Sequence, residues 1–274
     1  MPRCVSPIRW AGGKSWFIPH FNHYTEGLNY NRYIEPFLGG ASVFLSMEHP
    51  HEAYLSDVNE ELILAYQTIR DHPEDLIRQM QQYPNTEEEY YRVRALTPEA
   101  DIERAARFMY LNYTSFNGIY RVNQQGVYNV PYGFRNVVFD YDKIRTTSRQ
   151  LQGANIICGD FTVNQHQIQH GDLVFLDPPY SVSRRAGENV FIKYNARLFS
   201  LDEQHRLSRF IDYIKEQEAY YILTHAVHET IYEIFHKDGD RCEQLTRASL
   251  IGGRNAQRGQ VTEYLFTNIP EREE

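Results

Sequence analysis

The sequence contains few cysteines, and those present form no recognisable motif. Cys4, Cys158 and Cys242 are an odd, scattered set in 274 residues, without a CxxC spacing. Such a set argues against a disulfide framework and a cysteine-based zinc site, and it is typical of a reducing compartment. None of the eleven histidines belongs to an HExxH motif or an Asp/His cluster, so no metal is expected.

Long apolar runs and a signal-peptide pattern are also absent from the sequence. No run approaches the roughly 20 residues that a membrane-spanning helix requires. The first residues, Met1-Pro2-Arg3-Cys4, lack the regions of a signal peptide. We therefore expect a cytoplasmic protein with no membrane partner. The hydrophobic content of 42% is sufficient for one α/β core, or for a core with a smaller module.

The chain as a whole lacks a positive surplus, since its net charge is −8. This argues against a generally basic coat for nucleic acid. Positive charge is nevertheless concentrated locally: residues 104–150 carry seven Lys or Arg against two acids, and residues 241–260 carry four Arg against one. These segments are candidates for holding a polyanion, and ordinary charge fluctuation is the alternative.

The segment Gly12-Gly13-Lys14-Ser15 resembles the end of a phosphate-binding loop but lacks its first glycine. The P-loop spacing requires glycine at position 8, which is Ile8, and no apolar strand precedes it. We instead predict a glycine turn followed by a helix over residues 15–21. Lys14 at the start of that helix would form an anion-binding corner.

A strand, a glycine turn and a second strand follow. Residues 33–37 predict a strand, Gly39 and Gly40 a turn, residues 43–47 an apolar helix, and residues 53–56 a strand that ends at Asp57. The Rossmann nucleotide site has this plan, with an acid that holds ribose hydroxyls. The glycines are GG and not GxGxxG, which favours a nucleoside ligand without a pyrophosphate. The alternative is a βαβ start with an unrelated aspartate.

The middle of the chain changes from helical to hairpin character. Residues 60–112 carry several helix signals, among them an apolar stripe over 60–70. Asn123 to Gly126 is a tight-turn signal, so we predict a hairpin over residues 120–130. Its mixture of Arg, Asn and aromatic side chains suits base edges and stacking, although a purely structural hairpin is the alternative.

The segment Asp177-Pro178-Pro179-Tyr180 follows the short apolar run 173–176, which predicts a buried parallel strand. Two prolines hold the backbone extended and cannot donate hydrogen bonds. A carboxylate, main-chain acceptors and an aromatic ring together suit a planar nitrogen compound with an NH2 group. The alternative is a strand followed by a Pro-Pro turn.

Other elements are predicted around this segment. They are strands over 155–158 and 220–224, a polar loop over 181–193, a helix from the capping box at Ser200 to residue 214, and an antiparallel pair over 242–249 and 261–268.

Six motifs occur in a fixed order: RWAGGK, EPFLGGASVF, SDVNEELI, FNGIYRVNQQGVYNVPYG, GDF and LVFLDPPY. This set resembles the Dam-type DNA N6-adenine methyltransferases (D12 class, alpha group), in which the cofactor motifs precede the recognition domain and the catalytic motif follows. The resemblance extends from about residue 7 to residue 268. DPPY alone is moderately specific, whereas six motifs in this order are highly specific.

The resemblance implies S-adenosylmethionine as the cofactor, with Asp57 as the ribose-binding acid and Asp160-Phe161 facing the cofactor adenine. The implied cofactor contacts are Trp10, Lys14, Glu35, Phe37, Gly39, Gly40, Asp57, Asp160, Phe161 and Asp177. The implied catalytic residues are Asp177, Pro178, Pro179 and Tyr180. The implied DNA contacts are Arg9, Phe116, Asn117, Arg121, Asn129, Pro131 and Arg135.

The resemblance also implies a mechanism. An adenine inside a duplex cannot reach a sulfonium methyl group, so the base flips out at a cost of a few kcal/mol. Tyr180 stacks on the flipped base, and the Asp177 carboxylate and Pro178 carbonyl accept hydrogen bonds from the two N6 protons. These bonds favour a nitrogen lone pair directed at the methyl group.

The chain departs from the family pattern at two places. Phe134 stands where the family usually has a basic residue, with Arg135 one place on, which affects the contacts that flank the target site. Thr224-His225 stands where the family often has Ser-Asn. We expect this second departure to lie away from the chemistry.

We therefore predict an α/β protein with a Rossmann-like S-adenosylmethionine-dependent methyltransferase sheet and an inserted helical and β-hairpin DNA-recognition domain. The predicted catalytic domain comprises residues 1–59 and 151–274, and the recognition domain residues 60–150. The predicted substrate is double-stranded DNA, methylated at GATC.

Several alternatives remain open at this point. They are methylation of another DNA site, of RNA or of a protein amide, and a DNA-binding relative that has lost catalysis. The GG turn and DPPY disfavour a nicotinamide dehydrogenase. A cognate restriction endonuclease is a candidate partner, no obligate protein partner is inferred, and the nucleoid is the expected location.

Overall fold

The computed structural model describes residues 4–48, 52–134, 139–180, 182–185, 188–191, 199–248 and 260–271. The chain forms two compact units. The first comprises Met1–Glu26 and Leu38–Phe161, and the second comprises Gly27–Phe37 and Thr162–Glu274.

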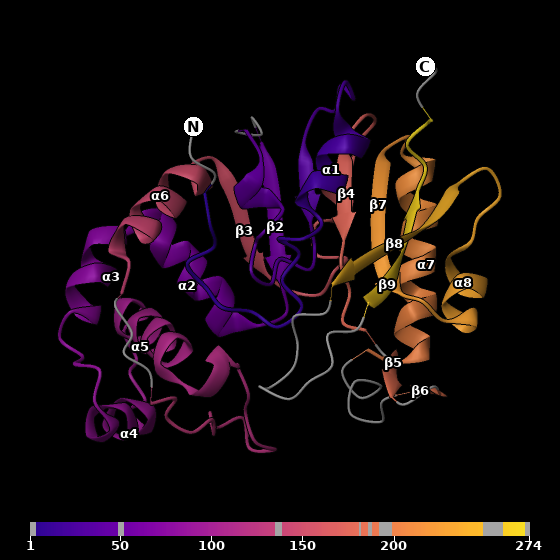
Figure 1. Ribbon diagram of the computed structural model, residues 1–274. Helices are drawn as coiled ribbons and strands as arrows, with labels where there is room; N and C mark the ends of the chain where they lie inside the picture. Colours follow the sequence, from indigo (N-terminus) through magenta and orange to yellow (C-terminus); the bar gives the residue numbers. More distant parts are fainter. Residues whose placement is uncertain are drawn as a thin grey trace. The chain divides into compact units, whose positions relative to one another are not determined.

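The first unit is mostly helical, with one pair of parallel strands (Figure 1). Its elements are α1 (Ile18–Thr25), η1 (Phe44–Ser46), β2 (Ala53–Asp57), α2 (Glu60–Asp71), α3 (Pro73–Met80), α4 (Glu87–Ala95), α5 (Asp101–Thr114), η2 (Phe116–Gly118), α6 (Tyr141–Leu151) and β3 (Ala154–Cys158). Strands β2 and β3 pair in parallel, from Ala53 opposite Ala154 to Asp57 opposite Cys158. This pairing places residues 57 to 59 beside residues 158 to 160.

Local sequence signals explain where these helices begin. The Asn59 side chain accepts a hydrogen bond from the Leu62 nitrogen at the start of α2, and Thr86 does the same for Glu89 at the start of α4. Pro73 occupies the first turn of α3, where a missing N–H costs nothing. Helices α2, α3 and α6 pack against one another, and α5 packs against α2, α3 and α4. The helical prediction for residues 60–112 is confirmed.

Two predictions for short helices differ from the structure, one in its bounds and one in its type. The helix predicted over 15–21 begins only at Ile18, with Pro19 in its first turn, and continues to Thr25. The apolar stretch 43–47 forms a single 3₁₀ turn, because the chain is already extended at Met47 on its way to β2. Helix α6 was not predicted, since Thr147 and Ser148 lie on its buried face beside only a few apolar residues.

The predicted hairpin has antiparallel contacts but no regular strands. Val122 and Tyr128 form an isolated bridge, and the Asn123 nitrogen donates to the Val127 carbonyl at 2.9 Å. The Asn123 side chain accepts from the nitrogens of Gln125 and Val127, which fixes the turn. We refer to residues 116–134 as the hairpin segment.

The second unit contains a five-stranded sheet. Its elements are β1 (Tyr33–Glu35), η3 (Gln165–Gln167), β4 (Leu173–Leu176), β5 (Val182–Arg185), β6 (Glu188–Phe191), α7 (Leu201–Glu216), β7 (Tyr220–Ala226), α8 (Glu229–Phe235), β8 (Arg241–Ala248) and β9 (Gln260–Thr267). Within this unit the strand order is β1-β4-β7-β9-β8. Strands β1, β4 and β7 are parallel, whereas β9 and β8 join them in antiparallel fashion.

Most predictions for the second unit are confirmed. Strand β4 is buried along its whole length, as expected for a parallel strand, and Ser200 caps α7 by accepting from the Glu203 nitrogen. The closing antiparallel pair is β8 with β9. Two details differ: the polar loop 181–193 contains the antiparallel pair β5–β6, and the seven-residue helix α8 was too short to be predicted.

The predicted α/β class is therefore confirmed. Parallel strands alternate with helices, and the antiparallel strands β9 and β8 complete the sheet of the second unit. The proposed domain boundaries at residues 60 and 150 stay a prediction, since the helices over 60–150 and strands β2 and β3 share one compact unit. No helix in the described part of the chain is both long and apolar enough to cross a membrane.

Candidate active site

The Asp57 carboxylate organises the glycine turn of the first unit. Its Oδ2 accepts a hydrogen bond from the Gly39 nitrogen at 3.0 Å, and its Oδ1 accepts one from the Asn59 nitrogen at 3.0 Å. Burial raises the pKa of Asp57 above its ordinary value, while these N–H bonds act in the opposite direction. The acid predicted from the strand end thus fixes the backbone of the predicted turn.

Trp10 lies directly against this turn. Gly39 has a positive φ of 46°, and a Cβ added to it would lie 2.8 Å from Cδ1 of Trp10, so no larger residue fits. A Cβ on Gly40 would lie 3.3 Å from Cβ of Trp10. The Trp10 ring also stacks on Tyr120, with ring centroids 5.7 Å apart and an interplanar angle of 27°. Trp10 therefore contacts both the glycine turn and the hairpin segment.

Lys14 differs from its predicted placement. Because α1 begins at Ile18, Lys14 precedes the helix by four residues and does not stand at its start. Its side chain is buried, with the ammonium 5.8 Å from the centre of the Trp16 ring. The prediction that Lys14 stands at a helix start is therefore wrong, and its role in an anion-binding corner stays a prediction.

Asp160 and Phe161 lie beside Asp57. The Gly159 nitrogen donates to the Asp57 carbonyl at 3.0 Å, as expected from the parallel register of β2 and β3. Phe161 is buried and Asp160 is half-buried. The structure therefore brings Asp57, Asp160 and Phe161 together at the neighbouring ends of β2 and β3.

Glu35 and Phe37 belong to the second unit. Glu35, at the end of β1, is buried and accepts a hydrogen bond from the Tyr33 hydroxyl at 2.9 Å. Burial, followed by the nearby Glu35 carboxylate, holds the pKa of Tyr33 well above its usual range. Phe37 meets Phe199 edge to face, with ring centroids 5.8 Å apart. These contacts fix the first half of the EPFLGG motif.

Asp177 emerges from β4 beside β7. Leu176 pairs with Leu223, so the next residues, Asp177 and Thr224, are neighbours. The Thr224 hydroxyl donates to Oδ1 of Asp177 at 3.0 Å. Pro178 is buried and Pro179 is exposed.

Glu263 and His225 both contact Tyr180. Its hydroxyl donates to Oε2 of Glu263 at 2.5 Å, and its ring stacks on His225 at 5.1 Å with an interplanar angle of 26°. Burial, together with the negative charges of Asp177 and Glu263, holds the pKa of Tyr180 well above its usual range. Tyr180 is therefore neutral at physiological pH.

These contacts correct one expectation. Thr224 and His225 were expected to lie away from the chemistry, but they touch Asp177 and Tyr180 respectively. The parallel pairing of β4 with β7 is the reason, because it brings residues far apart in sequence to the same strand ends.

Arg9 lies at the base of the hairpin segment. Its main chain is held by the buried Asn112 side chain, which accepts from the Arg9 nitrogen at 2.8 Å and donates to the Arg9 carbonyl at 2.7 Å. A Cβ on Gly118 would lie 2.5 Å from Cδ of Arg9. The neighbouring residues are exposed: Phe116 projects an apolar ring, and Asn117 has a positive φ of 58°. Three predicted DNA contacts, Arg9, Phe116 and Asn117, are thus clustered.

Arg121 and Asn129 are bonded across the hairpin segment. Nε of Arg121 donates to Oδ1 of Asn129 at 2.8 Å, and one Nη donates to the Asn129 carbonyl at 3.3 Å. The Pro131 carbonyl accepts from the Phe116 nitrogen at 2.9 Å, so the second arm returns to the first. Arg135, also predicted to contact DNA, lies outside the described residues.

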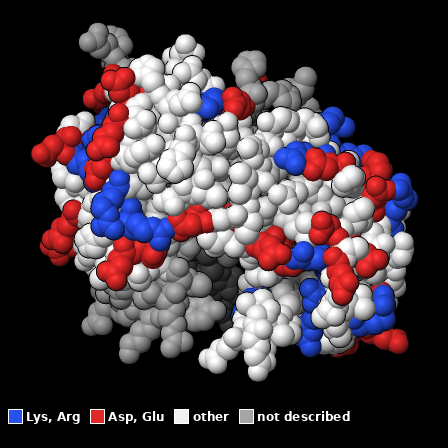
Figure 2. Space-filling model, turned by 180° about the vertical axis from the view of Figure 1, so that it is seen from behind, with Lys and Arg blue, Asp and Glu red and all other residues white. Residues whose placement is uncertain are grey.

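The positive surplus counted along residues 104–150 is smaller in the folded chain. Acids outside residues 104–150 neutralise cations inside that range, since Arg104 pairs with Glu60 and Glu61, and Arg145 pairs with Glu74. On the face seen in Figure 2, acidic and basic side chains are interspersed around a broad uncharged area. The exposed Arg121 has no acidic partner among the described residues.

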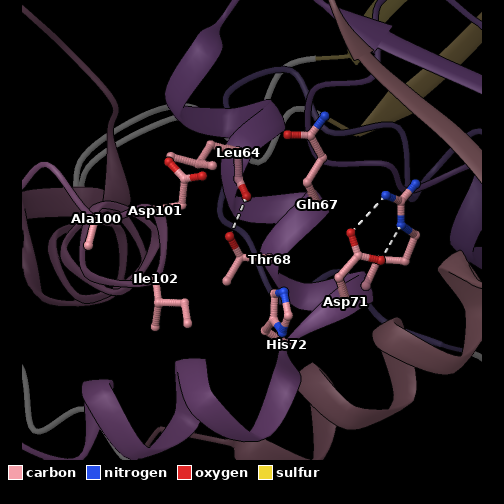
Figure 3. Close-up of a pocket in the computed structure, with 9 residues that line it drawn as sticks. Leu64, Gln67, Thr68, Asp71, His72, Ala100, Asp101 and Ile102 are labelled. Atoms are coloured by element: carbon pink, nitrogen blue, oxygen red, sulfur yellow. Dashed lines mark hydrogen bonds and ion pairs between the residues drawn. The ribbon is translucent and has the colours of Figure 1, made fainter.

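Among the cavities lined by described residues, two belong to the first unit. One of about 500 Å³ lies between the C-terminal half of α2 and the start of α5 (Figure 3), and none of the predicted site residues lines it. The other, of about 360 Å³, borders the hairpin segment at Tyr120, Val122 and Val127. The described residues contain no cluster of His, Cys, Asp and Glu that would hold a metal ion.

Four residues of this geometry were not predicted as contacts of the site: Asn112, Thr224, His225 and Glu263. Asn112 and Glu263 carried a signal, since each is a polar residue within a predicted helix or strand and is buried. Their partners depend on tertiary pairing.

Comparison with known proteins gives a consistent result. The family described as D12 class N6 adenine-specific DNA methyltransferase matches residues 10–248. The chain is 32% identical to the Type II methyltransferase M1.LlaDCHI of Lactococcus lactis subsp. cremoris, over 95% of this chain and 94% of that one. It is 31% identical to the Type II methyltransferase M.MjaIII of Methanocaldococcus jannaschii, over 80% and 83%. It is 27% identical to a DNA adenine methylase of Vibrio cholerae, over 96% and 95%.

Proposed function

The chain belongs to the D12 class of N6 adenine-specific DNA methyltransferases, and we propose that it transfers a methyl group from S-adenosylmethionine to a flipped-out adenine of double-stranded DNA in GATC. The observation that carries this proposal is the Asp177-Pro178-Pro179-Tyr180 segment at the end of β4, with Asp177 and Tyr180 fixed by β7 and β9.

The residues of the first unit fit the proposed cofactor. The Asp57 carboxylate stands at a strand end, where it suits ribose hydroxyls, and the absence of a Cβ at Gly39 lets Trp10 pack directly against the turn. The full set proposed to hold it is Trp10, Lys14, Glu35, Phe37, Gly39, Gly40, Asp57, Asp160, Phe161 and Asp177. When bound, S-adenosylmethionine supplies an electrophilic methyl group on its sulfonium.

The chain's own groups bind and orient the target base. The Asp177 carboxylate and the Pro178 carbonyl accept hydrogen bonds from the two N6–H groups of the adenine, which directs the nitrogen lone pair away from these acceptors. The neutral Tyr180 ring stacks on the base and helps to offset the few kcal/mol lost on flipping. Pro179 keeps the segment extended. Catalysis arises from positioning and local electrostatics.

We assign sequence recognition to residues 60–150. Phe116 and Asn117 enter the duplex from the hairpin segment, and the exposed Arg121 contacts a guanine in the major groove. The remaining proposed DNA contacts are Arg9, Asn129, Pro131 and Arg135. An exposed aromatic ring next to polar side chains supports this assignment.

Partners and location follow from the same proposal. Two relatives are named Type II methyltransferases, which supports a cognate restriction endonuclease as a partner in the same system. The proposed location is the cytoplasm, at the nucleoid. Methylation of another DNA site, or of RNA, is the competing activity, and a catalytically silent DNA-binding relative is the competing role.

Methylation-sensitive sequencing of DNA from cells that express this chain tests the reaction and the site together. N6-methyladenine at GATC, absent from cells that express Asp177→Ala, is the expected result. Methylation at a different sequence would refute the GATC assignment alone, and unmethylated DNA would refute the activity.

A further inference from the structure

The reacting side chains of the Asp-Pro-Pro-Tyr segment are bonded to two other strands of the second unit. Thr224 of β7 donates to Asp177, and Glu263 of β9 accepts from Tyr180. We propose that Thr224 and Glu263 are positioning residues for methyl transfer, Thr224 by orienting the Asp177 carboxylate and Glu263 by fixing the Tyr180 ring. This inference rests on the proposed function and goes beyond it, because neither residue belongs to the motifs that suggested it.

Thr224 is placed by the register of the sheet. Leu176 of β4 pairs with Leu223 of β7, so the Thr224 hydroxyl reaches Oδ1 of Asp177 at 3.0 Å. Thr224 is buried and lies within a regular strand, which leaves its side chain little freedom. A carboxylate held at one oxygen cannot rotate about its Cβ–Cγ bond without losing that hydrogen bond. The direction of the Asp177 acceptors is thereby set before the base arrives.

Glu263 divides its two oxygens between two partners. Oε2 accepts from the Tyr180 hydroxyl at 2.5 Å, and Oε1 accepts from Nε of Arg247 at 2.8 Å. Arg247 lies two residues beyond Leu245, which pairs with Glu263, and so it projects from the same face of the sheet. Glu263 is only 1% exposed, and a carboxylate this deeply buried costs free energy unless it is paired. Arg247 supplies the positive charge that pairs with the buried Glu263 carboxylate. The paired carboxylate is then a fixed acceptor for the Tyr180 hydroxyl.

His225 completes the support of the Tyr180 ring. Its imidazole stacks on the ring at 5.1 Å, and its Nε2 lies 3.2 Å from Oε1 of Gln204 on α7. The Tyr180 ring is thus held both at its hydroxyl, by Glu263, and at its face, by His225. An aromatic ring held in this way offers a stacking surface without first losing rotational freedom.

The Thr224 half of the proposal is tested with a matched pair of variants. Thr224→Val keeps the branched shape but removes the hydroxyl, whereas Thr224→Ser keeps the hydroxyl. With GATC duplexes and S-adenosylmethionine, Thr224→Val is expected to slow single-turnover methyl transfer roughly 10-fold, the size of one lost hydrogen bond to a charged acceptor. Thr224→Ser is expected to restore most of the rate.

A structural role for Thr224 would give a different pattern. Duplex affinity and the fluorescence of 2-aminopurine at the target position report binding and base flipping, and both are expected to stay unchanged in Thr224→Val. An unchanged rate in Thr224→Val, or a rate loss that follows lost duplex binding, would overturn this half.

The Glu263 half is tested with a double-mutant cycle. Tyr180→Phe removes the hydroxyl that Glu263 accepts, and Glu263→Gln weakens the same contact. If Glu263 acts through that hydroxyl, the double variant loses about as much transfer rate as the worse single variant. If the two single-variant losses in transfer rate multiply in the double variant, this half of the proposal is overturned. Thermal melting of the same variants reports the separate contribution of the Arg247 ion pair to stability.

Different results would refute the proposed function and the positioning roles. A wild-type protein that transfers no methyl group to adenine in DNA would overturn the proposed function and the positioning roles together. An active wild type with a fully active Thr224→Val and multiplying losses at Glu263 would overturn only the positioning roles.

Discussion

The carboxylate of Asp57 accepts a 3.0 Å hydrogen bond from the main-chain nitrogen of Gly39, and so ties the end of β2 to the glycine turn. The same turn carries the contact of Gly39 with Trp10. One acid therefore shapes the turn, and in our proposal it also binds the ribose of the cofactor.

Asp57→Ala is expected to weaken S-adenosylmethionine binding. The variant loses a charge-assisted hydrogen bond, worth about 1.5–3 kcal/mol, or roughly 10- to 100-fold in affinity. It also loosens the turn at Gly39. Isothermal calorimetry measures the effect, with DNA affinity as the control, since Asp57 is not a proposed DNA contact. Unchanged cofactor affinity would remove Asp57 from the site.

Acidification is expected to act on the cofactor and on the fold in opposite directions through Asp57. Burial raises the pKa of Asp57, so its protonated form is favoured in the folded protein relative to the unfolded chain. As the pH falls through this raised pKa, the contribution of Asp57 to the free energy of unfolding rises. Cofactor affinity falls in the same range, because the acceptors are lost. Asp57→Asn is expected to flatten this dependence, and calorimetry at several pH values would show whether it does.

Gly39→Ala is expected to lower both stability and cofactor affinity. The variant places a Cβ 2.8 Å from Trp10 at a residue with φ of 46°. Gly153→Ala is the matched control, because Gly153 has φ of 82° but open space around the added Cβ. Both variants carry about 1–2 kcal/mol of backbone strain. Equal melting temperatures and equal cofactor affinities in the two would contradict the role of the Trp10 contact.

Arg121→Ala tests the reading of the DNA sequence. If Arg121 contacts guanine O6 and N7, the variant loses about 1–3 kcal/mol of discrimination at one G·C pair. Methylation then spreads to duplexes altered at that pair, and binding to unrelated DNA changes little. GATC duplexes and singly substituted duplexes are compared at two salt concentrations. An equal loss on every duplex, with a shallower salt dependence, would reassign Arg121 to the phosphate backbone.

Local signals account for the elements that the sequence predicts well. The caps at Asn59, Thr86 and Ser200 act over three residues, so they are visible in the sequence itself. The strands that end at Asp57 and Asp177 are likewise short apolar runs closed by an acid. Six ordered motifs then led from these elements to the family.

Local sequence signals could not predict the supporting contacts of the site. Thr224 meets Asp177 across 47 residues, and Glu263 meets Tyr180 across 83 residues, so both contacts depend on strand pairing. The local charge count overestimated the positive surplus for the same reason. Arg104 pairs with Glu60 and Glu61 of α2, which lie outside its own segment. The start of α1 was misplaced because Pro19, and not Ser15, marks its first turn.

The central claim is that the Asp177 carboxylate accepts a hydrogen bond from the N6 group that is methylated. The most direct test is the single-turnover rate of methyl transfer to a GATC duplex by Asp177→Ala, measured alongside its affinity for the same duplex. Our account predicts that transfer is abolished while duplex affinity stays close to that of the wild type, because the variant removes an acceptor used in the reaction and no phosphate contact. Near-normal turnover by Asp177→Ala would contradict it.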